Sequence, residues 1–414
     1  MSHQGKGLAG AGLARLQGKQ KMVHELKKLP GYLKNVFLLA VLRPVAAVLR
    51  KTNKNFRGLW LVAERGIDAR DNGYWFFRYL RDKQPQVNTC YVIDKSSPDY
   101  EKVAQLGNTV AFRSLRHYLM YLAADQLIST HVQPASPDLM MYYHLRQIGI
   151  RPRGKQDLLQ HGIIMNEMKW MWYPQLRLDF FASGGKMEYD YLSSTFGFPE
   201  GVVQYTGLCR YDNLARANHP SNEILVMPTW RGSTYPQGKQ FYETPYYRQF
   251  QSMLNNPRLL RLLEEKDMKL VFYPHIELQK ELDKFTSPSG RVILASWRDY
   301  DVQDLLMRCN LLITDYSSVH FDVAYMEKPI IYYQFDMEDF RKFSYQEGYF
   351  FHDKHGFGPV VKTEDALIEA IVACAGNDFR MEKIYHDRLD VFFQMRDEKN
   401  CERTYQALCR LMEN

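Results

Sequence analysis

From about residue 58 onward, short apolar runs alternate with stretches whose apolar positions recur at helical spacing, as at 74–81 and 115–124. The first runs predict buried strands at Leu59–Ala63, Thr89–Ile93, Thr109–Phe112, Gln126–Ser129 and Asp157–Leu159. Strands that alternate with helices pair in parallel, and the helices cover the faces of the sheet. The pattern therefore predicts a doubly wound α/β domain.

A second series of the same kind follows the polar stretch at 215–222. Its predicted strands are Glu223–Met227, Lys269–Phe272, Arg291–Leu294, Leu311–Ile313 and Pro329–Tyr333. The fold class that we expect is therefore α/β with two Rossmann-like, doubly wound domains, and 414 residues suffice for both. The expected division is a leader at 1–57, an N-terminal domain at 58–218, a C-terminal domain at 219–375, and helices at 376–414 that pack back across the domains.

One predicted strand, Leu311–Ile313, runs directly into a helix. The capping residues Asp315, Ser317 and Ser318 precede apolar positions that recur at helical spacing. A helix N-terminus offers unpaired N–H groups, to which serine hydroxyls add donors, so this corner suits a phosphate. Asp322 lies one turn further on, where its charge would repel a phosphate, so we expect it to face a ligand hydroxyl or a cation. An ordinary capped helix remains the alternative.

Three other predicted strands are also followed by residues that can bind a ligand or take part in catalysis. The strand Asp157–Leu159 is followed by His161 and Gly162. The strand Glu223–Met227 is followed by Thr229, Trp230 and Arg231, and the strand Lys269–Phe272 by Pro274 and His275. Ligands of such folds bind beyond the carboxyl ends of the strands. An arginine can pair with phosphate oxygens, an indole can pack on a base, and a histidine can take a proton near neutral pH. The set predicts transfer of a phosphoryl-linked group.

Several alternatives lose support from motifs that the sequence does not contain. It has no GxxxxGK[ST] loop, no HExxH and no GxSxG, which disfavours P-loop, zincin and α/β-hydrolase chemistry. The six cysteines form no CxxC pair and no zinc-like cluster, so we expect reduced thiols. We also expect that the reaction needs no metal and no cofactor.

Charge is distributed unevenly along the chain. Residues 1–57 hold twelve Lys or Arg and one acid, whereas the remainder holds 42 bases and 46 acids. Within this leader, residues 31–51 are strongly apolar but are interrupted by Lys34, Arg43 and Pro44, which disfavours a transmembrane helix. We expect residues 1–57 to lie on an anionic membrane surface, and the alternative is a helix packed on the protein with solvated bases. Nucleic acid is not an expected partner, since no binding motif accompanies the basic residues.

Several of these motifs, taken in order, resemble the CDP-glycerol glycerophosphotransferase family of teichoic acid and capsule synthesis. The matching segments are His161-Gly162, Gly207–Asp212 (GLCRYD), Pro228–Arg231 (PTWR), His275 and Thr314–Asp322 (TDYSSVHFD), followed by Lys328–Tyr332, Glu347-Gly348, Gly358–Val360 and 392–403. The resemblance covers roughly residues 125–410. It departs from the family pattern at Gln160 and Ile163, where the family usually has tryptophan and threonine, and matches only partly at 273–276.

The resemblance implies a GT-B architecture, with two Rossmann-like domains facing a cleft and a CDP-linked donor held by the C-terminal one. His161 would be the general base, while His275, Ser317 and Ser318 would hold the donor pyrophosphate. Arg210 and Arg231 would help to neutralise it, and Asp322 would contact the donor.

The implied reaction moves glycerol phosphate from CDP-glycerol to a hydroxyl of a lipid-linked or polymeric acceptor and releases CMP. It would take place at the cytoplasmic face of the membrane. CDP-ribitol or another CDP-alcohol, a nucleotide-sugar glycosyltransferase, and a non-catalytic adaptor remain the alternatives.

Overall fold

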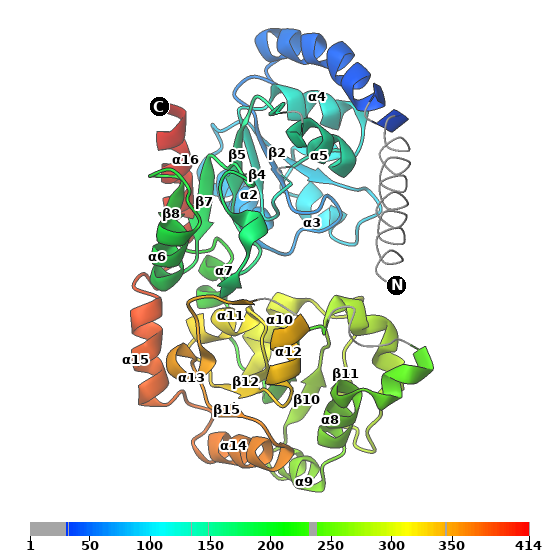
Figure 1. Ribbon diagram of the computed structural model, residues 1–414, viewed down its shortest axis with the longest axis vertical. Helices are drawn as coiled ribbons and strands as arrows, with labels where there is room; N and C mark the ends of the chain where they lie inside the picture. Colours follow the sequence, from blue (N-terminus) through cyan, green and yellow to red (C-terminus); the bar gives the residue numbers. More distant parts are fainter. Residues whose placement is uncertain are drawn as a thin grey trace, which may run out of the picture. The chain divides into compact units, whose positions relative to one another are not determined.

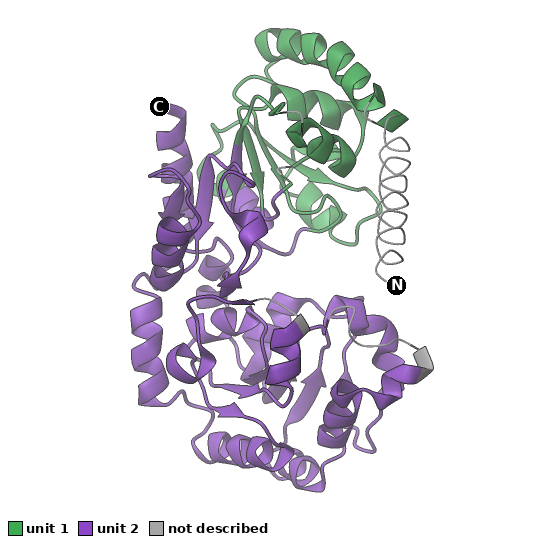
Figure 2. Ribbon diagram, in the orientation of Figure 1, with its two compact units in different colours: residues 1–68, 80–129, 133–155 green, residues 69–79, 130–132, 156–414 purple. Residues whose placement is uncertain are grey.

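A computed structural model describes residues 30–31, 33–133, 135–147, 149–231, 238–343 and 346–413 (Figure 1). The chain forms two compact units (Figure 2). Unit 1 comprises residues 1–68, 80–129 and 133–155, and unit 2 comprises residues 69–79, 130–132 and 156–414. Most of the predicted leader, residues 1–29, lies outside the described residues, and the expected division at residues 57, 218 and 375 stays a prediction.

Unit 1 is built on a parallel sheet in the order β3-β2-β1-β4. Its strands are β1 (Trp60–Ala63), β2 (Thr89–Ile93), β3 (Thr109–Ala111) and β4 (Gln126–Ser129). Its helices are α3 (Tyr100–Ala104), α4 (Leu115–Ala123) and α5 (Leu139–Gln147), while α2 (Asn72–Lys83) contributes residues to both units. Every residue of β1, β2 and β4 is buried, which explains their continuous apolar character.

A further helix of unit 1 spans residues 33–52. One face of it joins the core of the unit, where Leu39, Leu42 and Ala46 are at most 8% exposed. The other face exposes large apolar side chains, among them Phe37 at 71% and Val48 at 59%. In the described part of the chain, no helix is both long and apolar enough to cross a bilayer.

Unit 2 begins with three parallel strands in the order β5-β7-β8. They are β5 (Lys155–Leu158, whose first residue belongs to unit 1), β7 (Phe180–Ser183) and β8 (Val203–Tyr205). The helices of this part are η1 (Lys169–Met171), α6 (Lys186–Thr195) and α7 (Tyr211–Arg216). A short antiparallel pair joins β6 (Asn166–Glu167) to β14 (Gln346–Glu347).

The second sheet of unit 2 has six parallel strands in the order β11-β10-β9-β12-β13-β15. They are β9 (Glu223–Val226), β10 (Lys269–Phe272), β11 (Val292–Leu294), β12 (Cys309–Thr314), β13 (Ile330–Tyr333) and β15 (Val360–Val361). The order is Rossmann-like, and its direction reverses between β9 and β12, which is where ligands of such sheets bind. Leu312 faces one core, while Leu311 and Ile313 face the other, so β12 is buried on both faces.

Helices cover both faces of this second sheet. They are η3 (Gly238–Glu243), α8 (Pro245–Leu254), α9 (Pro257–Glu265), η4 (Ile276–Lys284), α10 (Val302–Arg308), α11 (Val319–Tyr325), α12 (Met337–Phe343), α13 (His352–His355) and α14 (Glu364–Gly376). Two further helices return to the first part of unit 2, where α15 (Lys383–Phe392) contacts α6, and α16 (Asn400–Glu413) contacts α7 and β7. All ten strands predicted from the sequence are confirmed within two residues at each end, and so is the α/β class. The strands β6, β7, β8, β14 and β15 were not predicted.

Candidate active site

His161 lies just beyond the carboxyl end of β5, at the tip of a sharp turn. The preceding residue, Gln160, has a positive φ of 62° and is only 2% exposed, whereas 74% of the His161 side chain is exposed. A buried residue in the left-handed region fixes the direction in which the chain leaves the strand. The backbone of the turn is therefore fixed, and it directs the imidazole of His161 toward solvent.

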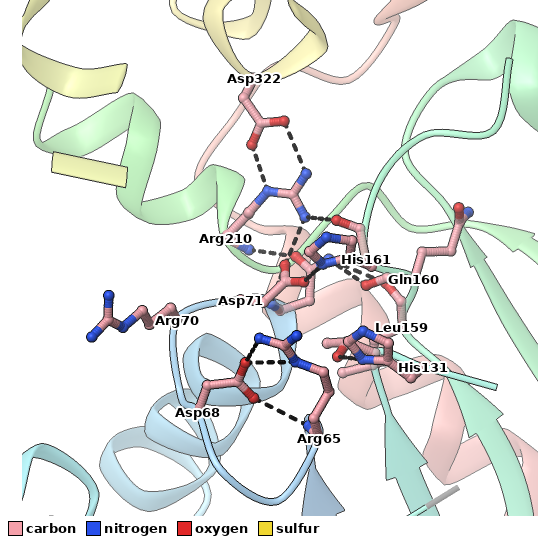
Figure 3. A network of polar contacts seen from close by, with 12 residues as sticks. Arg65, Asp68, Arg70, Asp71, His131, Leu159, Gln160, His161, Arg210 and Asp322 are labelled. Carbon is pink, nitrogen blue, oxygen red and sulfur yellow. Dashed lines mark hydrogen bonds and ion pairs between the residues drawn. The ribbon is translucent and has the colours of Figure 1, made fainter. Parts of the chain in front are cut away.

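The Asp71 carboxylate orients the ring of His161 (Figure 3). The His161 Nδ1 hydrogen-bonds to Asp71 Oδ2, and Asp71 Oδ1 accepts the backbone N–H of Asn72 at 2.7 Å. Burial alone would raise the pKa of Asp71, but the charges of Arg210 and His161 and these hydrogen bonds lower it to about 2. An ionised partner at Nδ1 selects the tautomer in which Nε2 is the nitrogen that takes up a proton.

The Arg210 guanidinium lies between two carboxylates. Its Nη1 donates to Asp71 Oδ1 at 2.8 Å and to the carbonyl oxygen of His161 at 2.9 Å, and its Nη2 donates to Asp322 Oδ2 at 2.9 Å. Burial alone would lower the pKa of Arg210, but the charges of Asp322 and Asp71 raise it well above its usual value. The line Asp322–Arg210–Asp71–His161 thus connects α11 to the exposed imidazole (Figure 3).

Asn72 is fully buried, and its side chain holds the same turn by hydrogen bonds. Its side-chain nitrogen donates to the carbonyl oxygens of Leu159 at 3.3 Å and Gln160 at 2.8 Å, and its oxygen accepts the backbone N–H of Arg210 at 3.0 Å. A second histidine, His131, packs on the ring of His161 with 5.3 Å between ring centroids and an angle of 27°.

Arg231 occupies the point of the second sheet where the strand order reverses. Its guanidinium, 3% exposed, contacts Asp315 at 2.7 Å and Asp336 at 2.7 Å. Asp315 also accepts the backbone N–H of Thr229 at 2.8 Å. Burial alone would lower the pKa of Arg231, but the two carboxylates raise it well above its usual value. Aromatic rings surround the guanidinium, namely those of Tyr246, Tyr316, Phe335 and Phe340.

His275 is exposed and is the N-cap residue immediately before η4. Its Nδ1 accepts the backbone N–H of Glu277 at 3.3 Å, so Nε2 carries the proton of the neutral ring and can donate it. Trp230 lies parallel to the ring with 6.1 Å between centroids. Burial lowers the pKa of His275, the charge of Glu277 raises it, and the charge of His161 lowers it further.

Ser317 and Ser318 precede α11, and Ser318 contacts the turn that carries His161. A Cβ on Gly162 would lie 2.7 Å from the hydroxyl oxygen of Ser318, so the glycine permits the close approach. Ser317 Oγ accepts the backbone N–H of Val319 at 3.4 Å. Pro274 is buried, and its carbonyl oxygen accepts the side chain of Gln279 at 2.8 Å.

Residues 45–410 match the model of the CDP-glycerol:poly(glycerophosphate) glycerophosphotransferase family. The chain belongs to this family. It is 28% identical over 376 residues to the minor teichoic acid biosynthesis protein GgaB of Bacillus subtilis (strain 168), covering 87% of the chain and 40% of GgaB. It is 22% identical to the teichoic acid poly(glycerol phosphate) polymerase of the same strain, covering 95% of the chain and 54% of that protein. The chain thus spans about half the length of these relatives, or less.

Solved structures share the fold of this glycerophosphotransferase family member. The wall teichoic acid polymerase TagF aligns with a TM-score of 0.61 at 16% identity, covering 94% of this chain and 98% of that one. The S. aureus MnaA–UDP structure aligns with a TM-score of 0.53 at 12% identity, covering 86% of this chain and 96% of that one. These likenesses confirm the GT-B class, and the family match confirms the resemblance seen in the sequence.

The structure brings several of the predicted site residues of this family member together. His161, Gly162, Arg210, Ser318 and Asp322 form one connected group. Asp322 faces a cation, Arg210, which was one of the two expectations for it. Direct neutralisation of the donor by Arg210 and Arg231 stays a prediction, because each guanidinium is already paired with two carboxylates.

Sequence reasoning missed Asp71, Asn72 and His131. His131 follows β4 by two residues, so the rule that identified His161 would also have found it. Asp71 lies 90 residues before its partner and follows no predicted strand directly, so no local pattern indicated it. In the described part of the chain, no group of three or more His, Cys, Asp or Glu residues could hold a metal ion.

Proposed function

We propose that this protein transfers a polyol phosphate, in the first instance glycerol phosphate from CDP-glycerol, to a hydroxyl of a lipid-linked or polymeric acceptor and releases CMP. The observation that carries this proposal is the exposed His161 ring, bonded through Nδ1 to Asp71, in a chain of the glycerophosphotransferase family. The names of the relatives supply the polymer class, teichoic acid, and one TagF structure is of a variant soaked with CDPG.

In the proposed reaction, the acceptor hydroxyl attacks the phosphorus that bears the glycerol, and its proton passes to Nε2 of His161. The new P–O bond forms as the pyrophosphate bond breaks, and CMP leaves with the bridging oxygen. Asp71 would stabilise the imidazolium that forms, as an orienting carboxylate does in other base-catalysed transfers. The remaining residues would align the hydroxyl with the phosphorus.

His275 and the two serines are proposed to hold the donor phosphates. The Nε2–H of His275 and the hydroxyls of Ser317 and Ser318 can donate to oxygens on which charge develops as CMP leaves. Trp230, stacked on His275, offers a flat surface for the base. Arg210 and Arg231 would contribute indirectly, because they hold Asp71 and Asp315 in place.

A different alcohol, such as ribitol, is the second candidate for the donor. Its support is a 29% identity over 237 residues to the ribitol-phosphate polymerase TarK of Staphylococcus aureus. The departures from the family pattern, Gln160 and Ile163, are only 2% and 3% exposed, so they give no sign of a changed donor surface.

A panel of donors tests the function. CDP-glycerol, CDP-ribitol and a UDP-sugar are added separately, and the melting temperature is measured, since a bound ligand raises it by mass action. We expect an increase of several degrees with a CDP-alcohol and little change with the UDP-sugar. A response to the UDP-sugar alone would favour a nucleotide-sugar glycosyltransferase.

The helix at 33–52 is proposed to lie on an anionic membrane at the cytoplasmic face. Its exposed apolar face, with Phe37 at 71% and Val41 at 49%, would enter the headgroup region, and Lys34 and Arg43 would attract anionic lipid. The double variant Phe37→Ser, Val41→Ser should sediment less with anionic liposomes while donor binding stays unchanged. Val391→Ser, at an apolar residue of α15 that is 60% exposed, is the matched control. Unchanged sedimentation of the double variant would exclude this surface.

A further inference from the structure

The turn that carries His161 is fastened to a carboxylate that is entirely buried. Glu188, in the first turn of α6, is 0% exposed. Its Oε1 accepts the backbone N–H of Ile164 at 2.7 Å, and its Oε2 accepts the backbone N–H of Gly184 at 2.7 Å and the hydroxyl of Ser183 at 3.1 Å. The carboxylate thus connects the turn to β7 and α6.

Glu188 also reaches the turn on the other side of the histidine. The side chain of Gln160 faces Glu188 and lowers the pKa of its carboxyl, and it donates a hydrogen bond to the carbonyl oxygen of Ala182. Gln160 precedes His161, and Ile164 follows it by three residues. One buried carboxylate is therefore bonded to the arm of the turn that follows the imidazole, and it faces a side chain from the arm that precedes it.

We propose that Glu188 is a positioning residue for His161, and that its ionised carboxylate holds the turn at 160–164 in the conformation that directs the imidazole toward the acceptor hydroxyl. This inference rests on the proposed function. An ionised carboxylate accepts the two backbone N–H bonds more strongly than a neutral carboxyl does. A proton on Oε2 would be donated to Ser183 Oγ, which itself donates to the carbonyl oxygen of Gly185 at 2.8 Å, and the bond from Gly184 to that oxygen would weaken. Protonation would therefore weaken the hold of Glu188 on the turn.

Burial raises the pKa of Glu188 to about 7, although the bonds from Ile164, Gly184, Gln160 and Ser183 lower it. Among the residues that the structure describes, the other titratable groups that face it are the phenols of Tyr211 and Tyr349. Burial raises the pKa of both phenols well above the usual value, and the charge of Glu188 adds to the increase, so they stay neutral. Glu188 is then the group in this cluster whose charge changes near neutral pH.

The test is Glu188→Gln, studied by steady-state kinetics across pH. We expect kcat to fall about 100-fold, because a displaced base loses its alignment, while the KM for the donor changes less than about twofold. In the wild type, both Glu188 and His161 must lose a proton, so log kcat should rise with a slope approaching about 2 at low pH. In Glu188→Gln the slope should fall to about 1. Unchanged kcat and slope would overturn the proposal.

Asp190→Asn is the matched control, since Asp190 lies on the same helix, is 57% exposed and pairs with Lys186. It should behave as the wild type. If Glu188→Gln does not fold, Ser183→Ala tests the proposal instead. The loss of one hydrogen-bond donor destabilises the Glu188 carboxylate, so the acid limb of the pH dependence of kcat should move up by about half a pH unit. An unmoved limb would contradict the proposal.

Hydrogen–deuterium exchange gives a readout that is independent of activity. The amide of Ile164 should exchange faster in Glu188→Gln than in the wild type, and faster in the wild type at pH 6 than at pH 8 after correction for intrinsic rates. If the wild type releases CMP from no CDP-alcohol, the proposed function is wrong, while exchange of the Ile164 amide still tests whether Glu188 holds the turn. If the wild type is active and exchange at Ile164 is unchanged, only the proposed role of Glu188 is wrong.

Discussion

Two buried arginines, Arg210 and Arg231, each lie between two aspartates, yet their surroundings differ. The Arg210 side chain is 8% exposed, and its network ends on the largely exposed ring of His161. Arg231 is 3% exposed, and its network ends inside a cage of aromatic rings. The network of Arg210 fixes the orientation of the His161 ring, whereas the network of Arg231 holds together the turns after β9 and β12.

In both networks an arginine of a family motif is paired with two carboxylates of the protein itself. Both residues suit phosphate by their chemistry, and their contact with a donor phosphate stays a prediction. Their variants should therefore fail in different ways, through misplaced chemistry at Arg210 and through loss of stability at Arg231.

Asp71→Asn should give the largest effect of the variants that separate the two networks. An amide at Nδ1 no longer selects the productive tautomer or stabilises the imidazolium, so kcat should fall by about 1,000-fold with little loss of donor binding. The carboxylate of Asp71, whose pKa is about 2, is ionised throughout the accessible pH range, so its own titration does not shape the profile. Without its negative charge, the acid limb should move to lower pH. A pH–rate profile equal to the wild type would remove Asp71 from the mechanism.

Arg231→Met should act on stability. It leaves the carboxylates of Asp315 and Asp336 buried without their cation, which costs about 3–5 kcal/mol of unfolding free energy. Urea unfolding of this variant and of the wild type measures the loss. Wild-type stability in this variant would show that the cage does not depend on the ion pairs.

Arg210→Lys tests the other network with the charge retained. A lysine cannot reproduce the paired bonds to Asp322 together with those to Asp71 and the carbonyl of His161, so kcat should fall about 10-fold to 100-fold in protein that stays folded. Circular dichroism and CMP release, measured on the same sample, separate folding from turnover. Equal loss of both signals would make Arg210 a stabilising residue like Arg231.

His275→Gln should give the smallest effect, because glutamine keeps both an acceptor for Glu277 N–H and a donor for phosphate. We expect donor affinity to weaken about tenfold, roughly the value of one hydrogen bond to a charged group. Since burial lowers the pKa of His275, the wild-type ring is neutral at pH 7, and donor affinity should increase as the pH falls through that lowered pKa. Calorimetric titration measures both effects, with the 39% exposed His386→Gln as control. Affinity that rises with pH would contradict this role.

The strands β9, β12 and β13 of the second sheet could be predicted from the sequence because they are buried and read as largely apolar runs. The strands β7 and β8, of four and three residues, were missed, although β3 and β11, of three residues each, were predicted. His161 and His275 could be identified by their position after strands. Asp71 and Asp336, the carboxylate partners of His161 and Arg231, could not be predicted, since they lie 90 and 105 residues from the groups that they contact and no local periodicity encodes such pairs.

The most direct test of the account is CMP release from CDP-glycerol in the presence of an acceptor, compared between the wild type and His161→Ala. Donor-induced thermal stabilisation is measured on the same preparations, and His219→Ala, at a histidine that is 55% exposed, serves as control. The account predicts that His161→Ala binds the donor normally and releases CMP about 1,000-fold more slowly, the range expected for a lost general base. A wild-type rate in His161→Ala would contradict it.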